Sequence, residues 1–128
     1  MANVLPGAEP FRFEGERASV LVLHGFTGTT QSMRYVGEQL NRRFGFTTSG
    51  PRLAGHGTSP DDMETTGYLD WLKSAEDALK ALAAEGRPVF VLGLSMGGSI
   101  TLNLAARFGD IVRGAISVNA PAQSLGSD

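Results

Sequence analysis

A serine between two glycines is the residue of this chain best suited to covalent chemistry. The segment Gly93–Gly97 has the pattern Gly-x-Ser-x-Gly, with Ser95 at its centre. It follows the apolar run Val89–Leu92 and precedes a helical pattern over Met96–Phe108, so a tight strand-to-helix turn is expected. Side chains two residues before or after the serine would collide in such a turn, which explains both glycines. The pattern predicts a nucleophile elbow that presents Ser95 at the N-terminus of a helix, where negative charge is favoured.

An attacking serine creates a tetrahedral oxyanion, which needs hydrogen-bond donors that are in place beforehand. In an elbow the first donor is the backbone N–H of the residue after the serine, here Met96. The second is expected from His24–Gly28, a glycine-containing loop that follows the buried run Ala18–Leu23. We therefore expect the N–H groups of Phe26 and Met96 to form the oxyanion hole. The alternatives are structural, with Ser95 as a helix cap and Phe26 as an apolar plug of a turn.

The rest of the chain alternates short apolar runs with amphipathic helical patterns. Strands that alternate with helices of about a dozen residues indicate βαβ units, so an α/β fold with a mostly parallel sheet and flanking helices is expected. A short edge strand is predicted at Phe11–Glu14 and a long loop at Gly50–Gly67. The other expected strands are 18–23, Phe46–Ser49, 89–92 and Arg113–Asn119, and the expected helices run from Thr29 or Thr30 to Arg43, from Tyr68 to Glu85 and over 96–108.

The composition excludes several classes of partner. The 128 residues suit one domain, and 41% hydrophobic with 19% charged residues is ordinary for a globular protein. A net charge of -2 without a basic stripe argues against nucleic acid, and no apolar run approaches the ~20 residues that span a bilayer. The chain has no cysteine and only His24 and His56 as histidines, so no disulfide, zinc site or cofactor is predicted. Because the N-terminus lacks the pattern of a signal peptide, the cytoplasm is the expected compartment.

Three motifs follow one another along the chain. They are His24–Gly28, Arg52–Gly57 with the sequence Arg-Leu-Ala-Gly-His-Gly, and Gly93–Gly98. Together they resemble the α/β-hydrolase carboxylesterases related to bacterial monoacylglycerol lipase, and the resemblance covers essentially the whole chain. It implies an α/β-hydrolase fold and a Ser-His-Asp esterase that hydrolyses short- to medium-chain acyl esters or monoglycerides. Ser95 would carry the acyl intermediate, and the amides of Phe26 and Met96 would bind the oxyanion.

The residues after Ser95 depart from the pattern of this family. In α/β-hydrolases the acid and the histidine of the triad follow the serine along the chain. Here no histidine follows Ser95, and the only acids after it are Asp110 and Asp128. Asp110 is expected at the far end of the elbow helix, on the opposite edge of the sheet. We therefore expect residues 1–128 to form a single, incomplete domain that ends after the strand following that helix, without the cap and the last strands.

Neither histidine has an acid partner that the sequence reveals. His24 is expected to hydrogen-bond within the oxyanion loop and His56 to organise its own loop, while the helix that contains Trp71 is expected to be scaffold. Without a general base serine is a weak nucleophile, and loss of triad members in serine hydrolases leaves roughly 10³–10⁴-fold catalysis over water. At most trace esterase activity is therefore expected from this chain alone.

Two other functions fit the same elbow. One is a non-catalytic hydrolase remnant that acts as a binding or interaction module, and the other is a thioesterase or acyltransferase. The strand at 113–119 should have an unpaired edge and exposed apolar faces. It therefore also predicts self-association or pairing with a complementary C-terminal fragment.

Overall fold

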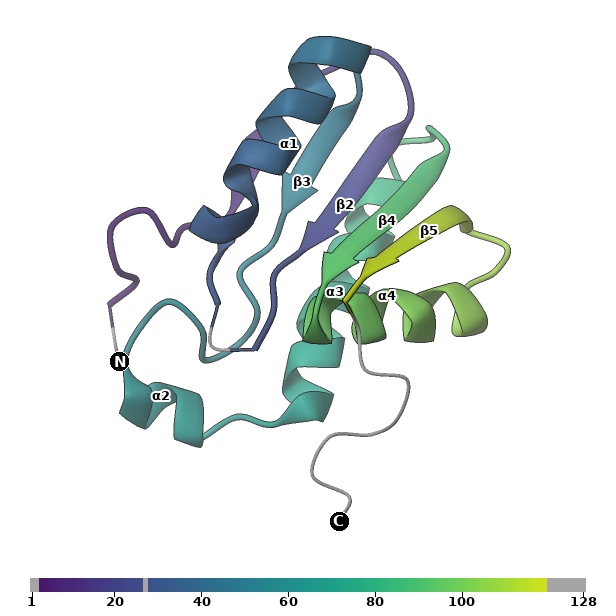
Figure 1. Cartoon of the computed structure of the whole chain (residues 1–128). Helices are drawn as coiled ribbons and strands as arrows, with labels where there is room; N and C mark the ends of the chain where they lie inside the picture. The colour runs from purple at the N-terminus through teal and green to yellow at the C-terminus, as the bar shows by residue number, and fades with distance from the viewer. Residues whose placement is uncertain (1–2, 27, 120–128) are drawn as a thin grey trace.

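A five-stranded sheet organises the protein. The structure is a computed structural model that describes residues 3–26 and 28–119. The strand order is β1-β3-β2-β4-β5, and every neighbouring pair is parallel except β1 with β3 (Figure 1). The expected, mostly parallel α/β sheet is thus confirmed. The strands are β1 (Phe11–Phe13), β2 (Ser19–Leu23), β3 (Thr47–Gly50), β4 (Val89–Leu94) and β5 (Val112–Val118).

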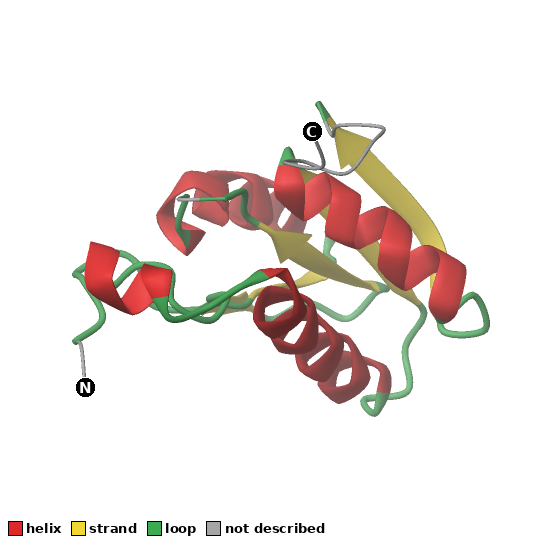
Figure 2. Cartoon of the chain, turned by 90° about the horizontal axis from the view of Figure 1, so that it is seen from below, coloured by secondary structure: helices red, strands yellow, loops and turns green. Residues whose placement is uncertain are grey.

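Helices cover both faces of this sheet. α1 lies on one face, and α3 and α4 lie on the other (Figures 1 and 2). Thr29 caps the start of α1, and Gly45 ends it with φ 75°, a left-handed conformation that suits glycine. All three helices were expected from the sequence, and their bounds are α1 (Thr30–Phe44), α3 (Tyr68–Ala83) and α4 (Met96–Arg107). In the described part of the chain, none of the helices combines the length and the hydropathy of a membrane span.

The segment expected to be a loop, Gly50–Gly67, contains a further short helix, α2 (Pro60–Glu64). The side chain of Ser59 caps it by accepting a hydrogen bond from the Asp62 amide, and proline occupies its first turn. The prediction of a loop was therefore wrong over these five residues. The helix has no buried face and its five residues show no apolar periodicity. Its only signal in the sequence was the Ser-Pro-Asp start.

Alternation along β2 divides the core into two layers. Every residue of β2 is buried, as its continuous apolar sequence predicts. Leu21 and Leu23 pack with the apolar stripes of α3 and α4, whereas Val20 and Val22 pack with the cluster under α1. The strand is thereby fixed on both faces, and the loop that follows it starts from a rigid support.

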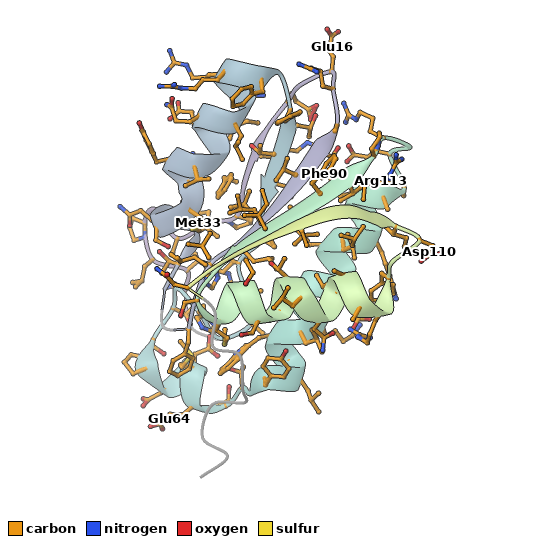
Figure 3. The ribbon with its side chains drawn as sticks, turned by 45° about the vertical axis from the view of Figure 1, so that its right-hand side comes forward. Glu16, Met33, Glu64, Phe90, Asp110 and Arg113 are labelled. Atoms are coloured by element: carbon orange, nitrogen blue, oxygen red, sulfur yellow. The ribbon has the colours of Figure 1, made fainter. Side chains whose placement is uncertain are left out.

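The face of β4 and β5 on the α1 side is not covered by a helix in the described structure. Phe90, Ile116 and Val118 are 37%, 55% and 39% exposed. Ile116 and Val118 of β5 pair in register with Leu92 and Leu94 of β4, so these four side chains share one face of the sheet. Phe90 lies on β4 as well (Figure 3). β5 is the last strand on this side of the described sheet. We call these five residues the apolar face of β4 and β5.

Candidate active site

Ser95 occupies a sharp turn between β4 and α4. Its backbone has φ 57° and ψ -121°, a region that residues with a side chain rarely adopt. A Cβ on Gly93 would lie 2.1 Å from the Gly97 carbonyl oxygen, and a Cβ on Gly97 would lie 2.5 Å from the carbonyl oxygens of Leu23 and His24. Both contacts are with backbone, so a side chain fits at neither position. The motif therefore forms the tight turn that its glycines predict, with no room for a side chain at position 93 or 97.

The backbone of Ser95 is hydrogen-bonded on both sides. Its N–H donates to the carbonyl of Val118 at the end of β5 over 2.8 Å, and its carbonyl accepts from the amides of Gly98 and Ser99 over 2.8 and 3.1 Å. Ser95 is exposed, and its hydroxyl makes no capping hydrogen bond to α4 in the described structure. The alternative in which Ser95 serves as the cap of α4 is therefore not supported.

The loop after β2 lies directly against the serine. A Cβ on Gly25 would be 3.4 Å from Ser95 Cβ and 3.9 Å from Ser95 Oγ. Phe26 is the next residue of this loop, and Met96 is the first residue of α4. The amide of a first helical residue has no carbonyl partner within its helix. The three site residues predicted from the sequence, Ser95, Phe26 and Met96, thus meet at one edge of the sheet. Thr27 of the same motif lies outside the described residues.

His24 joins this loop to a second one. Its Nδ1 is 2.9 Å from the Gly25 carbonyl oxygen, and its Nε2 is 3.1 Å from the Leu53 amide nitrogen. Because an amide only donates, Nε2 accepts and Nδ1–H donates to Gly25. Burial lowers the pKa of His24 to about 4, so the ring is neutral at pH 7. The expected hydrogen bond within the loop is present, while the bond to Leu53 was not predicted.

Three aromatic rings meet beside the loop. The ring of Trp71 lies 5.3 Å from Phe26 and 5.2 Å from His56, and Phe26 and His56 are 6.1 Å apart, all measured between centroids. We call this group the ring cluster. Two of its three contacts are edge-to-face, a favourable arrangement for aromatic pairs. Trp71 was expected to be scaffold because it adjoins the buried stripe of its helix, and helical periodicity does not reveal a contact with a distant loop.

His56 is the buried member of the ring cluster. Its Nδ1 is 3.0 Å from the Ala54 carbonyl oxygen, which agrees with the expected loop-organising role. Its Nε2 is buried and has no hydrogen-bond partner among the described residues. Burial lowers the pKa of this imidazole as well, so His56 is also neutral near pH 7.

Asp110 lies away from this site. Ser95 precedes the first turn of α4, whereas Asp110 follows its last turn, and Figure 3 shows Asp110 beyond that end of the helix. Its expected position on the opposite edge of the sheet is therefore confirmed. Asp128, the other acid after Ser95, lies outside the described residues.

Comparison with known proteins identifies the family of the chain. Residues 18–128 match a family model described as the alpha/beta hydrolase fold. The chain belongs to this family. The hydrolase fold expected from the three motifs is thereby confirmed, and so is the resemblance to carboxylesterases and monoacylglycerol lipase, because the relatives matched bear those names.

Two curated relatives and one solved structure are particularly similar to this hydrolase chain. It is 47% identical over 117 residues to the thermostable monoacylglycerol lipase of Bacillus sp. (strain H-257). This match covers 91% of this chain and 46% of that protein. It is 42% identical over 97 residues to the carboxylesterase of Bacillus subtilis (strain 168). This match covers 75% of this chain and 39% of that protein. A solved structure from work on LipS and LipT, two metagenome-derived lipolytic enzymes, superposes with a TM-score of 0.90 at 41% identity and covers 98% of this chain and 51% of that one. The chain therefore spans about half the length of these relatives.

Proposed function

We propose that this chain carries the nucleophile and the oxyanion hole of a serine esterase. In this proposal Ser95 Oγ attacks the acyl carbonyl of a short- to medium-chain ester or a monoglyceride, while the amides of Phe26 and Met96 stabilise the oxyanion. The carbon–oxygen bond to the alcohol then breaks, the alcohol takes up a proton, and an acyl-Ser95 intermediate is left for water to hydrolyse. The observation that carries the proposal is the strained turn at Ser95, packed against Gly25. The names of the relatives support the ester as the substrate class.

The proton of the Ser95 hydroxyl needs an acceptor in this mechanism. His24 uses both ring nitrogens to join the two loops, and His56 is fully buried with its Nδ1 bonded to Ala54. We therefore propose that neither histidine is the general base. No histidine follows Ser95 in the sequence, so we expect residues 1–128 alone to hydrolyse esters only at a trace rate.

The direct test is hydrolysis of a p-nitrophenyl butyrate ester by this chain and by its Ser95→Ala variant. Ser32→Ala serves as a matched control, because Ser32 is an exposed serine on α1. We expect a trace rate that Ser95→Ala abolishes and Ser32→Ala preserves, together with an acylated Ser95 peptide in mass spectrometry. Equal rates for the chain and Ser95→Ala would contradict the nucleophile. Full esterase turnover that depends on Ser95 would contradict the trace activity and point to His24 or His56.

A second proposal concerns assembly. The apolar face of β4 and β5, next to an edge strand, is the observation that favours it. We propose that this surface takes part in self-association or binds a complementary C-terminal fragment, and this role also fits a non-catalytic interaction module. A stable monomer at all concentrations in sedimentation, with no binding of such a fragment, would contradict it.

The cytoplasmic location expected from the N-terminal sequence remains part of the proposal. Fractionation of cells that express the chain tests it. Recovery outside the cytoplasmic fraction would contradict this location and leave the proposed chemistry unaffected.

A further inference from the structure

We propose that Trp71 and His56 are positioning residues that hold the amide of Phe26 towards Ser95. The proposal rests on the proposed oxyanion hole, because it concerns the group that would bind the oxyanion. It assigns a role to two side chains that the serine chemistry itself does not use.

The peptide unit between Gly25 and Phe26 explains why positioning is needed. Its N–H is the proposed donor and its C=O belongs to Gly25, and in a planar trans peptide the two groups point in opposite directions. The Gly25 carbonyl accepts hydrogen bonds from His24 Nδ1 over 2.9 Å and from the Gly28 amide over 3.0 Å. These bonds fix one end of the peptide plane. A glycine precedes Phe26, however, and glycine restricts the backbone least of all residues.

The side chain of Phe26 provides a second point of attachment. It is 49% exposed, so only part of the ring touches the protein. That part of the ring contacts the rings of Trp71 and His56. Aromatic pairs contribute stabilisation beyond the burial of their area, so these two contacts favour one position of a short loop.

Trp71 is itself held firmly. Its indole N–H donates to Thr66 Oγ1 over 3.0 Å, and the Thr66 hydroxyl donates to the Met63 carbonyl over 2.8 Å. Thr66 Oγ1 would lie 2.4 Å from a Cβ on Gly55, so the chain next to His56 packs closely against the same hydroxyl. The indole therefore has a fixed position on α3 from which it can support the half-exposed ring of Phe26.

His56 is not explained by stability alone. A buried nitrogen without a hydrogen-bond partner costs free energy, and Nε2 of His56 is such an atom among the described residues. An apolar side chain of similar size would avoid that cost. The contact that the imidazole makes with both Phe26 and Trp71 gives this position a role that an aliphatic side chain would not fill.

The experiment measures the Phe26 amide directly, so it does not depend on ester turnover. The chain has seven phenylalanines, and selective ¹⁵N labelling gives one amide signal for each. The signal lost in Phe26→Leu identifies Phe26. We expect an order parameter of about 0.85 for this amide in the unmodified chain and below about 0.6 in Trp71→Ala. Trp71→Phe, which keeps a ring, should restore most of the order, and His56→Leu should give an intermediate value.

Leu69→Ala is the matched control, because Leu69 lies on the same helix and is 78% exposed. We expect it to leave the Phe26 amide unchanged. Only variants whose other phenylalanine signals keep their positions are compared, and if Trp71→Ala unfolds, Trp71→Leu takes its place. An unchanged order parameter of the Phe26 amide in the ringless Trp71 variant would overturn the proposal. Ser95→Ala separates the two proposals, since it should abolish turnover while the Phe26 amide stays ordered.

Discussion

Nε2 of His24 accepts a hydrogen bond from the amide of Leu53 over 3.1 Å. This bond joins the loop beside Ser95 to the loop that carries His56, and it exists only while the imidazole is neutral. Two loops of the candidate site are thus held together by a group whose proton affinity the fold has reduced.

Acidification should therefore begin to destabilise the protein at a pH above the range in which its carboxylates titrate. The folded pKa of His24 is about 4 against an ordinary value of 6.5. Between these values the unfolded chain binds the proton and the folded chain does not. The contribution of His24 to the free energy of unfolding is therefore fully present above pH 6.5 and is lost as the pH falls towards 4. Between neutral pH and pH 4.5 the loss from His24 amounts to about 2 kcal/mol. Urea unfolding at neutral pH and near pH 4.5 measures it.

His24→Gln provides the comparison for this titration. The amide oxygen of glutamine accepts from Leu53 at any pH, so the loss of stability on acidification should shrink. His56 keeps its own contribution of the same sign, because burial lowers its pKa too. Glu85, whose pKa Arg12 lowers to about 2, loses its stabilising contribution as the pH falls from 4.5 towards 2, so it adds little at pH 4.5. Equal losses in the chain and in His24→Gln would show that His24 is not responsible.

The single tryptophan should report the protonation of His56. The two ring centroids lie 5.2 Å apart, and a protonated imidazole in contact with an indole quenches its fluorescence. Because burial lowers the pKa of His56 below 6.5, we expect the emission of Trp71 to stay constant near neutral pH and to fall only in more acidic solution. His56→Gln should remove this transition while the protein stays folded. A fluorescence titration at or above the ordinary histidine pKa would contradict the buried, neutral ring.

Substitution of Gly93 by alanine should be strongly destabilising. The new Cβ would meet the Gly97 carbonyl at 2.1 Å, a backbone contact that cannot move away cheaply. We expect a loss of about 2–4 kcal/mol, or failure to fold. Gly109→Ala is the control, because its Cβ would meet only a carbonyl at 3.5 Å. Urea midpoints for the two variants should differ clearly, and similar values would argue against a crowded turn.

Glycine at position 95 should give a more stable protein than alanine. Ser95 has a φ of 57°, which glycine adopts without strain and alanine does not. We expect Ser95→Gly to exceed Ser95→Ala by about 1 kcal/mol in the free energy of unfolding. The comparison separates backbone strain from the loss of the hydroxyl, since both variants lack it. A higher stability of Ser95→Ala would mean that the turn relaxes when the serine is removed.

Charge on the apolar face of β4 and β5 should weaken self-association. Ile116→Lys places an ammonium group in the middle of this face, and Leu102→Lys does the same at an exposed position of α4. In sedimentation velocity the first variant should shift the protein towards monomer, and the second should behave like the unmodified chain. Equal effects would indicate that net charge, rather than this surface, controls association.

Local patterns predicted much of the fold because each depends on neighbours in the chain. The apolar period of α3, the Thr29 cap and the crowding of Gly93 and Gly97 are all encoded within a few residues. β4 nevertheless continues to Leu94, two residues past its expected end, because Gly93 and Leu94 still pair with β5. That extension depends on a partner strand, which the local apolar run does not reveal.

The candidate site divides in the same way. Local sequence motifs predicted Ser95, Met96 and Phe26 as site residues. The contact of Trp71 with Phe26 and the bond from Leu53 to His24 depend on how α3 and two loops pack together. Residues about 30 to 45 positions apart are joined there, and no spacing rule connects them. Tertiary packing therefore supplied the residues around the site that sequence reasoning missed.

The hydrogen bond from the Ser95 amide to the Val118 carbonyl ties the turn at Ser95 to β5, an edge strand of the described sheet. Opening of a sheet begins at its margin, where half of the backbone groups face solvent. In this protein such opening reaches Ser95 directly, through its hydrogen bond to Val118. A ligand that binds along β5 would thus stabilise the turn at Ser95 without contacting the serine side chain.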